Sequence, residues 1–155
     1  MRRSTIFLIT AVLTLTTPLM WAVDQLAGTW LLKHQEVGSN QTASNPLTLA
    51  ITPSGNRLNF EFIVTVNNEQ FVNLKFSSLL DGTATEISGG DGKPIGTARV
   101  SRDGAAYKVL IEGPGRPPVA TQMTISSDGM TLVSESDVQT PTGTVLHTKQ
   151  VFARQ

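Results

Sequence analysis

Turn-forming residues recur along the chain at intervals of about 10 to 15 residues, and this spacing limits the possible folds more than any other feature. Asp-Gly pairs occur four times, at residues 81–82, 91–92, 103–104 and 128–129. Asp-Gly between extended segments favours a tight hairpin, because both residues tolerate a positive φ. The intervals leave no room for long helices, so the chain is predicted to form consecutive antiparallel strands.

Apolar and polar residues alternate between these turns, as they do in strands that are buried on one face. In the stretch 58–66, the residues Leu58, Phe60, Phe62, Val64 and Val66 fall on one face. The same alternation appears in the stretches 107–111, 119–125 and 146–152. These stretches are rich in Val, Ile, Thr and Phe, which favour strands. The sequence therefore predicts an all-β protein of eight to ten strands.

Two architectures are compatible with this pattern. Neighbouring strands joined by tight turns form an up-and-down meander, which closes naturally into a barrel and leaves no exposed sheet edge. A β-sandwich of the Greek-key type needs a long crossing connection, and the only long irregular stretch is Val37 to Asn45, after the first predicted strand. We therefore expect an antiparallel barrel, with the β-sandwich as the alternative.

The first 22 residues have the composition of a cleavable signal peptide. Arg2 and Arg3 precede a short apolar run, Ile6 to Leu15, and Ala22 supplies a small residue for cleavage. The alternative, an uncleaved membrane anchor, is disfavoured because about 10 apolar residues are too few to span a bilayer comfortably. We expect residues 1–22 to be removed and residues 23–155 to form one domain that is secreted or periplasmic and not inserted in a membrane.

Charge and cysteine content exclude several classes of function. After residue 22 the chain has ten Lys and Arg against twelve Asp and Glu, without a run of one sign. This balance gives no electrostatic basis for binding nucleic acid or an anionic membrane. The chain has no cysteine, which excludes disulfides, a thiolate nucleophile and lipidation at a cysteine.

Both ends of the predicted domain resemble a known superfamily. The sequence Gly28-Thr29-Trp30 opens the first predicted strand and resembles the signature of the lipocalin superfamily, within the calycins. The segments Ser126–Leu132 and Val151–Gln155 are similar to secreted bacterial lipocalin-like domain proteins. The sequence departs from typical lipocalins in lacking a disulfide, a Thr-Asp-Tyr-like element and a helix after the last predicted strand.

The resemblance implies a structural role for three residues. Gly28 would let the chain turn tightly into the barrel, Trp30 would plug the closed end, and Arg154 would lie across the indole. Such a cation–π contact contributes about 0.5–2 kcal/mol. First and last strands would then meet at this point to close the barrel.

Few residues point to chemistry. Strand parity puts Leu32, His34 and Glu36 on the same face as Trp30, and His147 lies in the last predicted strand with the parity opposite to Phe152. Two histidines and a glutamate can bind zinc or transfer protons, but no motif brings these three together. The chain also has no Gly-x-Ser-x-Gly element. We therefore expect no enzymatic activity, no metal site and no cofactor.

The inward faces supply the one positive indication of function, since they can line an apolar cavity for a small hydrophobic ligand. The same side chains also suit a filled core, and the alternative function is therefore a structural or protein-interaction module of the cell envelope, with contacts through the loops 37–45 and 113–118. The predicted ligand-binding residues are Leu32, His34, Phe60, Phe62, Val64, Tyr107, Val109, Met123 and Ile125.

Overall fold

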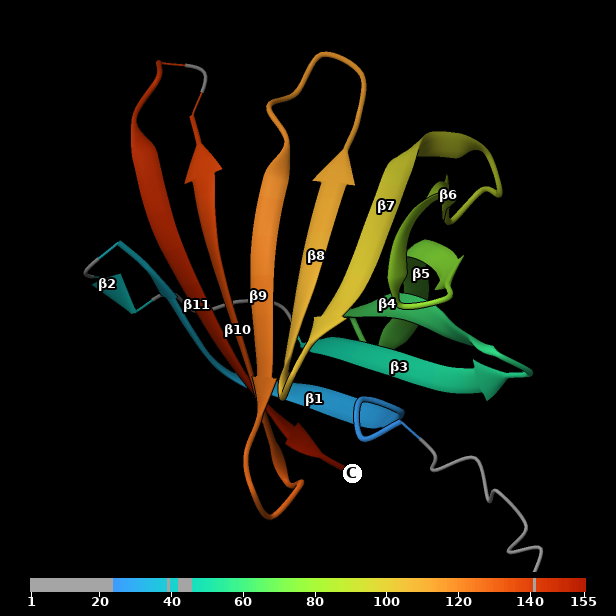
Figure 1. Ribbon diagram of the computed structural model, residues 1–155. Coiled ribbons are helices and arrows are strands. Elements are labelled where there is room, and N and C mark those ends of the chain that lie inside the picture. Colours follow the sequence, from blue (N-terminus) through green and yellow to red (C-terminus); the bar gives the residue numbers. More distant parts are fainter. Residues whose placement is uncertain (1–23, 39, 42–45, 141) are drawn as a thin grey trace, which may run out of the picture.

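Antiparallel strands make up most of the chain that the structure describes, as the turn spacing predicts (Figure 1). The computed structural model describes residues 24–38, 40–41, 46–140 and 142–155, and the predicted signal peptide lies outside these residues. Within this part of the chain there is no helix, and so none that could cross a membrane. The strands are β1 (Gly28–Val37), β2 (Asn40–Gln41), β3 (Leu47–Ser54), β4 (Arg57–Val66), β5 (Glu69–Ser78), β6 (Asp81–Gly89), β7 (Pro94–Asp103), β8 (Ala106–Glu112), β9 (Val119–Ile125), β10 (Thr131–Gln139) and β11 (Val145–Arg154).

The strands form a closed barrel. Each strand from β3 to β11 pairs with its neighbour in sequence, and β1 pairs with β3 on one side and with β11 on the other. The two-residue strand β2 only extends the end of β1. The prediction of an all-β, antiparallel barrel is thus confirmed, with ten strands in the wall, and the β-sandwich alternative is wrong. The closure follows from the unbroken series of hairpins, which leaves the first and last long strands as the two edges that must pair.

The barrel is closed at one end and open at the other. The β3–β4, β5–β6, β7–β8 and β9–β10 turns lie at the closed end, together with the start of β1 and the C-terminus (Figure 1). The apolar core fills this half, and its largest fully buried side chains include Trp30, Tyr107, Phe60 and Phe152. Near the open end, inward-facing residues such as Val64, Val119 and Leu146 are only half-buried. The hydrophobic effect therefore stabilises mainly one half of the barrel.

Arg154, in the last strand, holds the closed end together. Its guanidinium lies 4.2 Å from the centre of the Trp30 ring. The same group donates hydrogen bonds to the carbonyl oxygens of Gln25 (2.6 Å), Ala27 (2.8 Å) and Gly129 (2.7 Å). One side chain thus connects the segment before β1, the first strand and the β9–β10 turn. Hydrogen bonds from a charged donor are stronger than those between neutral groups.

Gly28 is required by this arrangement in two ways. Its φ of +151° is one that residues with a side chain rarely adopt. A Cβ atom at this position would also lie 2.6 Å from Nη1 of Arg154. The structure therefore brings together the three residues, Gly28, Trp30 and Arg154, that the resemblance to lipocalins implies at the closed end.

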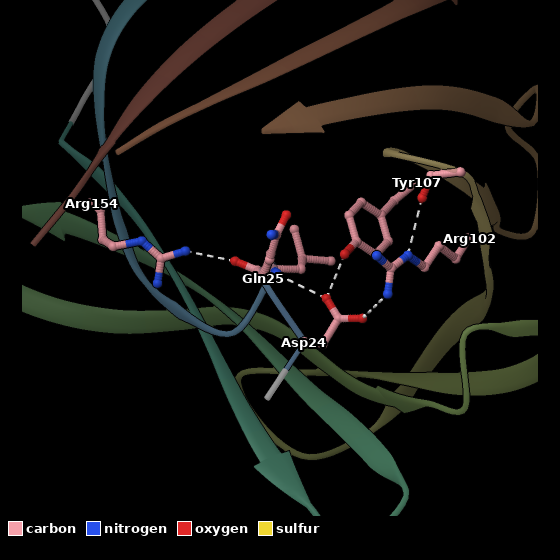
Figure 2. A network of polar contacts seen from close by, with 7 residues as sticks. Asp24, Gln25, Arg102, Tyr107 and Arg154 are labelled. Carbon is pink, nitrogen blue, oxygen red and sulfur yellow. Dashed lines mark hydrogen bonds and ion pairs between the residues drawn. The ribbon is translucent and has the colours of Figure 1, made fainter. Parts of the chain in front are cut away.

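A second polar cluster fastens the segment before β1 to the opposite side of the same end (Figure 2). Oδ1 of Asp24 accepts hydrogen bonds from the Tyr107 hydroxyl (2.5 Å) and from the backbone N–H of Leu26 (2.8 Å). Its other oxygen forms an ion pair with Arg102 at 3.4 Å. The segment 24–27 therefore crosses the closed end, and we call it the strap. The side chain of its Leu26 is fully buried. The Trp30 indole N–H donates a hydrogen bond to the Leu26 carbonyl at 2.9 Å.

Trp30→Ala should lower the free energy of unfolding by about 3–5 kcal/mol, because it removes the largest fully buried side chain among the described residues and leaves a cavity beneath the strap. Urea unfolding followed by circular dichroism measures this change. A variant as stable as the unaltered protein would show that the indole does not close the barrel.

Tyr107 should make stability depend on pH in the alkaline range. Burial and the hydrogen bond to Asp24 raise the pKa of Tyr107 to about 12, from an ordinary value of 10.0. The folded state therefore favours the neutral phenol, and this contribution is complete below pH 10 and is lost as the pH rises towards 12. In urea titrations across this range, the unaltered protein should lose more stability than Tyr107→Phe, which cannot ionise. Parallel losses in the two proteins would contradict the assignment.

Candidate ligand-binding site

An apolar cavity lies at the open end of the barrel, where the wall is not filled by the core. Its volume is about 300 Å³, which is at the lower end of the range for small-molecule sites. Apolar residues of five neighbouring strands, β5 to β9, form most of its wall, and the end of β8 with the loop between β8 and β9 forms the rest. The lining residues are Leu74, Ile87, Ile95, Ile111, Glu112, Gly113, Pro114, Arg116, Pro117 and Val119.

A register shift brings Ile95 to this cavity. Ile87 pairs with Gly96 and Ser88 with Pro94, so Ile95 is an extra residue on β7 and forms a bulge. A bulge re-aims side chains locally, and the Ile95 side chain lies near Gly89, at 3.4 Å from where a Cβ of that glycine would be. Ile95 thus both lines the cavity and is 44% exposed.

Exposed apolar side chains surround the open end. Val66 and Phe71 lie on the β4–β5 hairpin, Ile95 at the start of β7 and Val145 at the start of β11. Their exposed fractions range from 40% for Val66 to 59% for Val145. In a soluble domain, exposed apolar residues that gather in one region indicate a site of interaction. This distribution singles out the open end, since among the large exposed apolar residues of the described chain only Met130 lies at the other end.

A hollow larger than this cavity lies on the outer wall of the barrel. It is a groove of about 680 Å³ across β7 to β11. Most of its lining residues face outward. They include the apolar residues Leu110 and Ala120 and the charged residues Arg99, Lys108 and Asp137. A third hollow, of about 350 Å³, lies beside β5 and β6, which pair at only two positions and have Phe60 and Phe76 behind them. Neither outer hollow is enclosed by the barrel.

The predicted ligand-binding residues lie closer to the closed end than the cavity does. Phe60, Tyr107, Val109 and Met123 are buried members of the core, and Leu32, Phe62 and Ile125 pack against that core. Val64 is half-buried towards the open end. None of the nine predicted residues lines the cavity, and Val109 instead borders the outer groove. Their contact with a ligand stays a prediction.

The expectation that His34 and Glu36 point into the barrel is wrong. Leu32 pairs with the buried Phe152, but His34 pairs with Val151, so Lys33 is an extra residue that forms a bulge. The bulge reverses the alternation of faces in the rest of β1. His34 and Glu36 therefore face outward, and Gln35 faces inward opposite Gln150.

The histidines form hydrogen bonds with acidic side chains on the outer wall. Nε2 of His34 lies 2.7 Å from Oε1 of Glu36, and the hydrogen bond to His34 lowers the pKa of Glu36. Nδ1 of His147 lies 3.0 Å from Oδ1 of Asp137. Among the residues that the structure describes, no three His, Cys, Asp or Glu side chains are placed to hold a metal ion.

The sequence contained part of the signal for the cavity. Ile111 and Val119 share the alternation of Tyr107 and Met123, and extending those faces to the strand ends would have found them. Leu74 and Ile95 could not be found in this way. Leu74 follows the bulge at Asn73 in β5, and Ile95 itself forms the bulge in β7. A bulge breaks the period-two pattern on which the prediction rests.

Comparison with solved structures supports the fold at low sequence identity. Zebrafish ileal bile acid-binding protein in complex with cholic acid matches with a TM-score of 0.56 at 19% identity, over 84% of this chain and 99% of that chain. Apo lipid binding protein 8 of Caenorhabditis elegans has a TM-score of 0.59 at 12% identity, over 84% and 96%. The fluorescent protein UnaG gives 0.55 at 14% identity, over 84% and 98%.

At such identities the likeness to these neighbours shows the fold alone. It agrees with the resemblance to the lipocalin superfamily at that level. No protein-family model matches the chain, and no curated protein matches it in sequence.

Proposed function

We propose that this protein binds a small hydrophobic molecule, without covalent chemistry, in the open half of its barrel. The observation that carries the proposal is the apolar cavity lined by Leu74, Ile111 and Val119, which opens among exposed apolar side chains at one end. Binding there would remove apolar surface of both partners from water, at about 25 cal/mol for each Å². The ordered closed half would meanwhile provide a rigid support, so little ordering would be needed on binding.

The structural neighbours add support of a limited kind. One is a bile acid-binding protein complexed with cholic acid and another is a lipid binding protein. Both are binding proteins whose barrels have the same overall form as this one. The fold is therefore compatible with the proposed function, while the residues of the cavity itself provide the specific argument.

A second candidate function is the binding of a protein partner on the outer wall. The groove of about 680 Å³ across β7 to β11 favours it, because this groove is larger than the inner cavity and mixes apolar with charged side chains. A surface that combines polar and apolar side chains in this way is typical of interfaces in non-obligate protein complexes. Neighbouring positions on β9 separate the two candidates, because Val119 faces the cavity and Ala120 faces the groove.

Val119→Trp should weaken binding of an apolar fluorescent probe, such as an anilinonaphthalene sulfonate, by about tenfold or more, because the indole would occupy a small cavity. Ala120→Trp is the matched control, and it should leave the probe affinity unchanged. Fluorescence titration measures both, and urea unfolding checks that the variants are folded. Loss of binding in Ala120→Trp alone would place the probe in the outer groove and contradict the proposal.

We further propose that residues 1–22 act as a signal peptide and that the protein works after export, in the periplasm or outside the cell. The positively charged start, the short apolar run and the small residue Ala22 support this. The strap begins at Asp24, one residue beyond the proposed cleavage point, so cleavage there would leave the contacts of Asp24 with Tyr107 and of Gln25 with Arg154 in place.

The full chain, expressed with its own leader, should yield an exported protein whose intact mass corresponds to residues 23–155. Mass spectrometry of the exported fraction gives this mass directly. A protein that keeps residues 1–22 and stays with the membrane fraction would support the anchor instead. A native spectrum of the same sample should also show an additional mass that is lost on denaturation, if a ligand is carried through purification.

A further inference from the structure

The inner wall of the barrel is not uniformly apolar, and its polar residues lie together. Cross-strand pairing aligns Ser134 with Gln150, and Gln150 with Gln35. The next row towards the open end aligns Thr121 with Ser136, and Ser136 with Thr148. Paired residues in an antiparallel ladder face the same side, and this side is the inside, because Leu132 and Phe152 in the same alternation are buried. We call these six residues the polar band: Gln35, Thr121, Ser134, Ser136, Thr148 and Gln150.

Apolar rows border the polar band above and below. Leu132 and Phe152 form the row towards the closed end, and Val138 and Leu146 form the row towards the open end. The band is therefore a localised feature of the inner wall and not a gradual change towards solvent. On the opposite wall, the aligned residues Leu49, Phe62 and Leu74 are all apolar.

Every member of the polar band is neutral. Nε2 of Gln150 donates a hydrogen bond to Oε1 of Gln35 at 2.9 Å, which orders the two amides across the β1–β11 seam. The other members are hydroxyls, each of which can donate and accept. All six are half-buried except Ser134, which is 6% exposed. Hydroxyls and amides in this setting are the few polar groups that orient a ligand in an otherwise apolar site.

The cations near the interior lie outside the polar band. Arg116 lines the cavity, but it is exposed and lies in the loop between β8 and β9. Arg154 binds three backbone carbonyls and Trp30 at the closed end, and Arg102 pairs with Asp24. Lys149, next to the band in sequence, faces outward opposite Glu36. A buried carboxylate is costly unless it is paired with a cation, and the polar band offers none. A hydroxyl or amide of a ligand carries no such cost and can form hydrogen bonds with the band.

From these contacts we infer that the ligand is an apolar molecule with an uncharged hydroxyl or amide group, which is bound by the polar band, and not a carboxylate such as an ionised fatty acid. This inference rests on the proposed function and names the chemical class of its ligand. The apolar part would lie against Leu74, Ile111 and Val119, and the polar group would lie across the barrel on β9 to β11.

Decanol and decanoate test the inference, since they share a chain and differ in the charge of the head group. In competition with the fluorescent probe at a pH of about 8, where the carboxylate is ionised, decanol should bind at least about tenfold more tightly than decanoate. Equal binding, or tighter binding of decanoate, would overturn the inference and leave the proposed function standing. Failure of the probe and both ligands to bind would contradict the proposed function itself.

Variants of the polar band show whether it causes the selectivity. The double variant Ser136→Ala with Thr148→Val should weaken decanol about tenfold by removing two hydroxyls, and leave decanoate nearly unchanged. Thr124→Val is the matched control on the outer face of β9, and it should alter neither affinity. Thr148→Arg should reverse the preference by giving a carboxylate its partner. Unaltered selectivity in the folded band variants would show that the band does not bind the head group.

Discussion

The contact of Arg154 with Trp30 and with three backbone carbonyls is the interaction on which the rest of the barrel depends. A meander of hairpins is continuous everywhere except at its two edges, and here those edges are β1 and β11. Arg154 lies at the end of β11, Trp30 near the start of β1, and they pair directly in the ladder. One guanidinium therefore joins the two edges, the strap and the β9–β10 turn, where no covalent cross-link is available in a chain without cysteine.

Consolidation of one end leaves the other end free for binding. The buried side chains gather between the strap and the middle of the barrel, and the strap adds a second set of polar contacts through Asp24, Tyr107 and Arg102 (Figure 2). Towards the open end the strands continue, but their inward side chains are smaller or half-buried and enclose a cavity. The distribution of buried side chains thus divides the barrel into two halves. The closed half is packed without a ligand, and the open half has room for one.

Bulges decide which residues reach the interior. If Lys33 were paired regularly and not bulged, the alternation of β1 would direct His34 and Glu36 into the barrel, and the inner wall would carry a charge at that level. With the bulge, the neutral Gln35 takes the inward position and pairs with Gln150. The shift at Ile95 similarly brings an isoleucine to the mouth of the cavity. Single bulged residues thus decide which side chains face the interior, both in β1 and in β7.

The sequence by itself determined the class of fold and the positions of several strands, and its motif at residues 28–30 carried the resemblance that implies the residues at the closed end. These properties depend on local signals: Asp-Gly turns, period-two alternation and a short motif around Trp30, all of which act within a few residues. Only the tertiary structure decided which side chains share the cavity and which form the polar band. Those groupings depend on the register between strands and on the bulges at Lys33, Asn73 and Ile95, which break the alternation. They also depend on the pairing of β1 with β11, which brings together residues more than a hundred positions apart in the sequence. Register results from the packing of the whole barrel, because a shift of one residue exchanges the two faces of a strand, and no local pattern records it.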